Sequence, residues 1–139
     1  MERGVEVGVG RQPVPHPGGQ LRARDGGAEV EEIVLRDLKM APCLEIYACF
    51  RDGNCVIRDD MDTIYPKLLE ADVVIIASPI FFYGVTSQAK ALIDRCQALW
   101  ARKHILKRSL PDGGRKGAFI AVGATQGKRL FEGVVLTVK

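Results

Sequence analysis

Three cysteines lie close together in this sequence and are its clearest candidates for redox or metal chemistry. Cys43, Cys49 and Cys55 are spaced C-x5-C-x5-C, and a fourth cysteine, Cys96, lies well apart from them. Thiolates hold iron–sulfur clusters, usually four to a cluster, and they also hold zinc. Neither a C-x2-C pair nor a neighbouring histidine accompanies the three, so the spacing does not favour zinc. Because no secretory signal is recognised, we expect reduced thiols, metal ligands or core residues in preference to disulfides.

The second candidate is the stretch "SPIFFYG", residues 78–84, in which Phe81, Phe82 and Tyr83 are consecutive. It follows the apolar run "DVVIIA", and a second apolar run, "KGAFIAVGAT", leads into the small-residue loop "GATQGK", residues 123–128. Ligands of open α/β sheets bind beside the carboxyl ends of the strands. Aromatic side chains next to backbone N–H groups suit a flat ring with a polar edge, such as isoalloxazine. Two interpretations remain open: a cofactor pocket, or aromatic side chains that cap the core or contact another subunit.

The elements that would position these loops follow from apolar periodicity. Both apolar runs are typical of strands buried on both faces of a parallel sheet. Between them the pattern predicts a helix that starts near Thr86. Its charged residues are placed off the apolar face: Lys90, Asp94, Arg95 and Arg102. An earlier helix begins after Asp59 or Asp60, and Pro66 is expected to kink it or to delay its regular part. Residues 29–37, "EVEEIVLRD", predict a strand near a sheet edge.

This alternation of strands and helices predicts an α/β fold with a doubly wound parallel sheet. Residues 5–10 are a candidate first strand, whereas residues 11–28 are rich in proline, glycine and arginine and show little helical periodicity. A length of 139 residues, 47% of them hydrophobic, suits a single domain.

Charge and hydropathy narrow the function classes. The net charge of +3 is too small to indicate nucleic acid, and no stretch indicates a membrane span. The expected compartment is the cytoplasm. The basic segment at residues 100–117 is interpreted as a solvated loop, with attraction of a nicotinamide phosphate or an acidic partner as the alternative.

Three stretches together resemble a known family. They read "APCLEIYACFRDGNCVIRDDM", "ADVVIIASPIFFYGVTSQAKALIDR" and "GAFIAVGATQGKRLFEG". They are similar to the flavodoxin-like NAD(P)H-dependent FMN reductases, in particular the iron-sulfur flavoprotein branch, over about residues 28–138. The resemblance implies a flavodoxin-like domain over residues 1–139, with three α/β/α layers. It also implies a domain incomplete at both ends, because residues 1–28 are atypical, with a composition typical of disorder, and a final strand and helix are missing.

The resemblance further implies FMN at the strand ends and NAD(P)H as co-substrate, with electrons passed to an acceptor. The residues that it implies around the flavin are Ser78, Pro79, Ile80, Phe81, Phe82, Tyr83, Gly84, Gly123, Ala124, Thr125 and Gln126. We assign no catalytic side chain, because the flavin carries the chemistry. A homodimer or tetramer is implied as well. The alternatives are a flavin-binding electron carrier, or a truncated or frameshifted relative that acts as an interaction domain.

Two departures from the family pattern bear on cofactors. The branch carries a compact motif of four cysteines, and Ile46 stands where the resemblance would place one of them. Cys43, Cys49 and Cys55 are thus candidate metal ligands, but an intact cluster is not the favoured interpretation, and Cys96 is expected to be a buried small hydrophobe. The family's phosphate loop is replaced by "GVGRQPVPHPGGQ", in which Gly8, Gly10 and Arg11 are candidates for part of a phosphate cradle.

Overall fold

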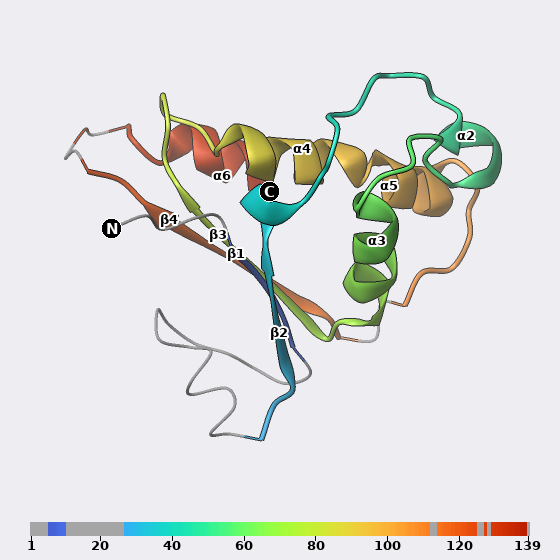
Figure 1. Cartoon of the computed structure of the whole chain (residues 1–139), viewed down its shortest axis with the longest axis horizontal. Coiled ribbons are helices and arrows are strands. Elements are labelled where there is room, and N and C mark those ends of the chain that lie inside the picture. Colours follow the sequence, from blue (N-terminus) through green and yellow to red (C-terminus); the bar gives the residue numbers. More distant parts are fainter. Residues whose placement is uncertain (1–5, 11–26, 112–113, 125–126, 128, 139) are drawn as a thin grey trace.

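The computed structural model describes residues 6–10, 27–111, 114–124, 127 and 129–138 (Figure 1). Within them, four strands form one sheet: β1 (Glu6–Gly10), β2 (Val30–Val34), β3 (Val73–Pro79) and β4 (Lys116–Val122). They lie in the order β2-β1-β3-β4. Flavodoxin-like sheets share this order, which agrees with the predicted α/β class.

Strand β1 runs in the opposite direction to the one that a wholly parallel sheet requires. Strands β3 and β4 are parallel, whereas β1 is antiparallel to both β2 and β3. A parallel β1 would need a crossover connection of about a dozen residues or more, usually with a helix. Residues 11–28 carry prolines and glycines in place of helical periodicity. An antiparallel pairing needs no such helix, and this is the physical reason we see for the reversal.

The reversal changes which end of β1 lies near the candidate binding loop. Glu6 pairs with Ala77, near the carboxyl end of β3, whereas Gly10 pairs with Val73 at the opposite end. The seven residues of β3 span about 20 Å from one end of the strand to the other. Gly8 pairs with Ile75 in the middle of β3 and so also lies away from the carboxyl end of that strand. The prediction that Gly8 and Gly10 help to form a phosphate cradle at that edge is therefore wrong, and Arg11 lies outside the described residues.

The described helices form a single layer. They are a 3-10 turn η1 (Leu35–Asp37), α2 (Cys49–Asp52), α3 (Met61–Glu70), α4 (Ser87–Arg95), α5 (Gln97–His104) and α6 (Glu132–Val138). Figure 1 shows them gathered on one side of the sheet. The third layer that the resemblance implied is not found in the described part of the chain. None of the described helices is long and apolar enough to cross a membrane.

The core lies between the sheet and this helical layer. Its buried residues come from β2, η1, α3, α4 and α5 and are Ile33, Leu35, Met61, Ile64, Tyr65, Leu68, Ala89, Leu92 and Ala98. Burying a large aliphatic side chain contributes roughly 1.5–3 kcal/mol, so these contacts dominate the stability of the layer. Helix α3 continues through Pro66 from Met61 to Glu70, so the expected delay of its regular part does not occur.

Candidate binding site at the strand ends

The stretch after β3 folds into a tight turn whose two central residues are aromatic. Phe81 N–H donates to the Gly84 carbonyl at 3.0 Å, and Gly84 N–H donates to the Phe81 carbonyl at 2.9 Å. Between them, Phe82 and Tyr83 have φ values of 48° and 64°. Two successive positive φ angles define a type I′ turn, which normally carries Asn and Gly. Left-handed conformations of other residues cost roughly 1–2 kcal/mol each.

The second predicted loop lies beside this turn. Ile80 N–H donates to the carbonyl of Val122, the last residue of β4, at 2.9 Å. A Cβ atom built on Gly123 would stand 3.5 Å from Ile80 Cδ1. The structure thus brings residues 78–84 together with Gly123 at one edge of the sheet. Ala124 follows on the surface, while Thr125 and Gln126 lie outside the described residues.

Ser78 joins the start of the aromatic loop, residues 78–84, to Thr86 just after its end. Its side chain is buried, and Ser78 Oγ donates to the Pro79 carbonyl at 2.9 Å and accepts from Thr86 N–H at 3.4 Å. Thr86 Oγ1 in turn accepts from Ala89 N–H at 3.3 Å and so caps the start of α4. This confirms the helix start predicted near Thr86. The Ser78 hydroxyl is occupied in these contacts, and the assignment of Ser78 to a cofactor site stays a prediction.

The surface of the turn matches the face of a flat aromatic ligand. The exposed fractions of Phe81, Phe82 and Tyr83 are 59%, 102% and 60%. No group in the described part of the chain accepts a hydrogen bond from the N–H of Phe82 or Tyr83. Apolar rings next to unpaired N–H donors fit the ring of FMN, which has apolar faces and a polar edge. The donor set therefore fits the ring end of that cofactor, whereas the described residues hold no cradle for its phosphate.

The cysteine loop occupies a different part of the molecule, between η1 and α3. Its three thiols are free and partly buried. No set of three His, Cys, Asp or Glu side chains in the described ranges is placed to hold a metal. Ile46 is 58% exposed and is flanked by Glu45 and Tyr47 at φ 53° and 55°. The structure therefore does not support the predicted ligand set of Cys43, Cys49 and Cys55.

Burial controls the chemistry of two thiols. It raises the pKa of Cys49, an effect to which the nearby thiols of Cys55 and Cys43 add. Burial also raises the pKa of Cys96 to about 11. Cys96 packs against the core between α4 and α5, as expected of a small hydrophobe. Such thiols are poor nucleophiles near neutral pH, because the thiolate is the reactive form.

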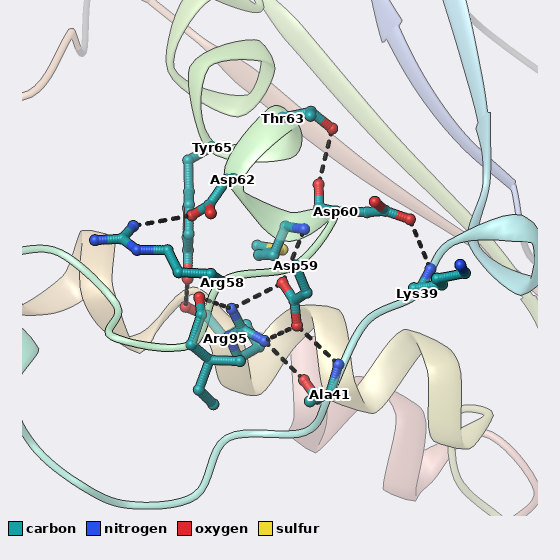
Figure 2. A network of polar contacts seen from close by, with 11 residues as sticks. Lys39, Ala41, Arg58, Asp59, Asp60, Asp62, Thr63, Tyr65 and Arg95 are labelled. Atoms are coloured by element: carbon teal, nitrogen blue, oxygen red, sulfur yellow. Dashed lines mark hydrogen bonds and ion pairs between the residues drawn. The ribbon is translucent and has the colours of Figure 1, made fainter.

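A buried ion pair fixes both ends of the cysteine loop, residues 38–60 (Figure 2). Arg95, only 1% exposed, donates from Nη1 to Asp59 Oδ2 at 2.7 Å and from Nη2 to Asp59 Oδ1 at 3.1 Å. The same guanidinium donates to the carbonyls of Ala41 and Ile57 at 2.9 and 3.3 Å. Tyr65 Oη donates to the Arg95 carbonyl at 2.9 Å. Burial raises the pKa of Asp59, but hydrogen bonds from Arg95, Ala41 and Met61 outweigh it and hold that pKa below its usual value.

The prediction that Arg95 lies off the apolar face of its helix is wrong. Arg95 lies three positions after Leu92, which places it on the buried stripe of α4, where Asp59 and two carbonyls replace water. The spacing of three residues between Leu92 and Arg95 was the signal in the sequence that Arg95 lies on the buried face of the helix. The partner was not readable, because Asp59 lies 36 residues away in the chain.

Three arginines of the basic segment bind backbone carbonyls. Arg102 Nε donates to the Gly53 carbonyl at 2.7 Å, and Arg108 Nη1 donates to the Asp52 carbonyl at 2.8 Å. Arg115 donates to the carbonyls of Ala71 and Leu68 at the end of α3. The segment is largely exposed, as a solvated loop requires, and the three arginines tie it to the cysteine loop and to α3.

Comparison with known proteins shows what the chain is similar to. Residues 14–132 match the family model of the NADPH-dependent FMN reductases. The chain is 33% identical over 127 residues to an iron-sulfur flavoprotein of Methanocaldococcus jannaschii, which covers 86% of this chain and 62% of that protein. It is 35% identical over 104 residues to an iron-sulfur flavoprotein of Methanosarcina thermophila, with 75% and 51% covered.

A more distant relative is a putative NAD(P)H-dependent FMN-containing oxidoreductase of Bacillus subtilis. It is 30% identical over 69 residues, which are 50% of this chain and 38% of that protein. The chain thus spans between half and two thirds of the length of the first two relatives. No solved structure matches the chain.

Proposed function

Because the chain belongs to the NADPH-dependent FMN reductase family, we propose that it is an FMN-dependent oxidoreductase that takes electrons from NAD(P)H and passes them to an acceptor. The observation that carries the proposal is the turn at Phe81–Gly84. It presents exposed aromatic rings, and two of these residues adopt left-handed backbone conformations that are energetically unfavourable for them. Strained conformations of this kind cluster at ligand clamps and active sites.

In this proposal the chain binds and orients the flavin ring. Phe81, Phe82 and Tyr83 provide its apolar contacts, and the N–H groups of Phe82 and Tyr83 donate hydrogen bonds to its polar edge. Gly123, with Ala124, Thr125 and Gln126 after it, belongs to the second wall. When bound, FMN supplies the hydride-accepting chemistry, and no side chain of this chain is required as an acid or base.

We assign no intact iron–sulfur cluster to this chain, although two relatives are named iron-sulfur flavoproteins. A cluster usually takes four thiolates. The loop supplies three, and Ile46 stands at the position where the family resemblance places another. The flavin is then the redox centre through which electrons leave for the acceptor.

The proposal includes assembly as a homodimer or tetramer in the cytoplasm. Val122 is 65% exposed at the end of β4, and no described helix covers the sheet face that it shares with Ile75 and Ile120. Ile75 and Ile120 are partly buried, and apolar residues on an uncovered sheet face are typical of protein contacts. The free cysteines agree with a reducing compartment.

FMN titration of the purified protein tests the binding part of this proposal. Flavin fluorescence reports the dissociation constant for the wild type, for Phe82→Ala and for Ile105→Ala. Ile105 is a matched control, because it is also an exposed hydrophobic residue, 43% exposed, but it follows α5. We expect Phe82→Ala to weaken binding about tenfold, the size of one stacking contact, and Ile105→Ala to bind as the wild type. Equal affinity of the two variants would remove Phe82 from the site.

Anaerobic addition of NADH or NADPH to the FMN-loaded protein tests the reaction. Bleaching of the flavin absorbance is expected with at least one of the two nucleotides. A flavin that only a chemical reductant bleaches would instead identify an electron carrier. A wild type that retains no FMN after gel filtration would contradict the proposal as a whole.

A further inference from the structure

Helix α6 packs against the aromatic turn with no room for a side chain at Gly133. A Cβ atom at this position would stand 2.2 Å from the Tyr83 carbonyl oxygen and 3.2 Å from its carbon. Separations below about 3 Å are not tolerated by real side chains, and the obstacle here is backbone. Any residue other than glycine therefore has to move either α6 or the turn.

The same segment also packs on the second loop. The Leu130 side chain is buried, and its Cδ2 atom lies 2.4 Å from the place where a Cβ of Gly123 would stand. Val134, one residue beyond Gly133, is 3% exposed, whereas Leu136 is 80% exposed. Leu130 and Gly133 thus hold α6 and the residue two positions before it against both loops of the candidate site, while Leu136 on the outer side of the helix faces solvent.

We propose that α6 is a clamp that sets the position of the aromatic turn, and that Gly133 is its positioning residue. The inference rests on the proposed function in one respect, because the ligand whose affinity depends on the position of the turn is FMN. Strained turns persist only where their surroundings hold them. Beyond its own two hydrogen bonds, the turn is held by Ile80, by the contacts of Ser78 and by α6.

Docking of α6 and ligand binding are then linked in both directions. If the turn binds FMN only in the conformation that α6 holds, FMN must stabilise the docked helix by the same factor. In the interior of an isolated helix, alanine is more favourable than glycine. Gly133 is the second residue of α6, so its replacement by alanine leaves the helix able to form while it obstructs docking, and this separates docking from helix formation.

Three glycines allow a graded experiment. We expect Gly133→Ala to weaken FMN binding about tenfold or more, because backbone must shift. Gly123→Ala should weaken it less, because the obstacle is the end of the flexible Leu130 side chain. Gly117→Ala is the matched control, because Gly117 lies in β4 outside both loops and its Cβ would meet only the Val74 carbonyl oxygen at an ordinary 4.0 Å. Dissociation constants from flavin fluorescence should follow this order, and equal constants for Gly133→Ala and Gly117→Ala would overturn the proposal.

Hydrogen exchange supplies a second readout that needs no activity. In the wild type, FMN should slow exchange of the α6 amides, and in Gly133→Ala it should not. Without ligand, the amides of Phe81 and Gly84, both hydrogen-bonded across the turn, should exchange faster in Gly133→Ala than in Gly117→Ala. Identical exchange of these two amides in both variants would refute the role of α6 as a clamp, whether or not the wild type binds FMN. Failure of the wild type to bind FMN would by itself refute only the proposed function.

Discussion

Phe82 is the residue at which stability and proposed function oppose each other. Its side chain is fully exposed, so no packing within the described residues offsets the cost of its φ of 48°. A residue selected only for folding at this position would be Asn or Gly. The aromatic side chain is therefore most simply explained by what it contacts when a ligand is present.

Replacement of Phe82 by asparagine should make the protein more stable and a weaker flavin binder. Asparagine tolerates the left-handed region, so the free energy of unfolding is expected to rise by about 0.5–1 kcal/mol. Urea denaturation and FMN titration measure the two effects. Val56→Asn is the control, because Val56 is 46% exposed in a loop without a positive φ, and no gain is expected there. A Phe82→Asn variant with unchanged FMN affinity would show that the ring has no role.

The Asp59 carboxylate is the only charged partner of the buried Arg95 among the described residues. Asp59→Asn should lower the free energy of unfolding by about 3 kcal/mol, because it leaves a buried cation without its counter-ion. Asp62→Asn breaks the exposed pair with Arg58 and should cost less than about 1 kcal/mol. Equal losses in the two variants would show that burial does not set the strength of the Asp59 pair.

The same carboxylate predicts a pH dependence. The folded-state pKa of Asp59 is lowered, so the pair contributes fully above the unfolded-state pKa of about 4. The contribution is lost as the pH falls through the lower, folded-state pKa. Denaturation curves of the wild type and Asp59→Asn should therefore differ most at neutral pH and converge in acid. Parallel curves down to the acid transition would exclude the linkage.

Among the elements, the short helix α2 depends on a close approach by α5. Its C-cap, Gly53, has a φ of 80°, and a Cβ atom there would stand 2.4 Å from Arg102 Cγ. Arg102 also donates to the Gly53 carbonyl and to Asn54 Oδ1. The tip of the cysteine loop is therefore tied to α5 through one glycine and one arginine.

Gly53→Ala should destabilise the protein more than Gly114→Ala. Both glycines have positive φ, at 80° and 78°, so alanine introduces about 1 kcal/mol of backbone strain at either. Only at Gly53 must a neighbour also move, since nothing lies within 4 Å of a Cβ at Gly114. The difference between the two unfolding free energies measures the Arg102 contact, and no difference would mean that this contact contributes nothing.

Periodicity located the elements whose apolar residues face a common layer. The i+3 and i+4 spacing placed α3 and α4, and unbroken apolar runs placed β3 and β4, because burial of those residues drives their formation. It did not give the direction of β1, which depends on the connection that follows. Nor did it place Arg95 or the contact between Gly133 and Tyr83, because both join segments that are remote in the chain. The left-handed turn was invisible because Phe and Tyr normally avoid it.

For the whole molecule, the cysteine loop is held by protein groups from end to end. Arg95 fastens its ends, and Arg102 and Arg108 fasten its tip. We therefore expect thermal unfolding to occur at the same temperature with and without a strong chelator under anaerobic conditions. Iron content before and after chelation gives the control. A transition that falls after loss of bound iron would show that a metal contributes to the fold.

The same arginine has a consequence for folding rates. The Arg95 guanidinium joins residues 36, 38 and 54 positions away in the chain. Contacts of such long range require large loop closures, which cost conformational entropy, and we expect this pair to form after the folding transition state. Loss of the Arg95–Asp59 pair should then accelerate unfolding and leave the refolding rate nearly unchanged. The pair thus acts mainly on how long the native state persists, and the cysteine loop is released on the timescale of global unfolding.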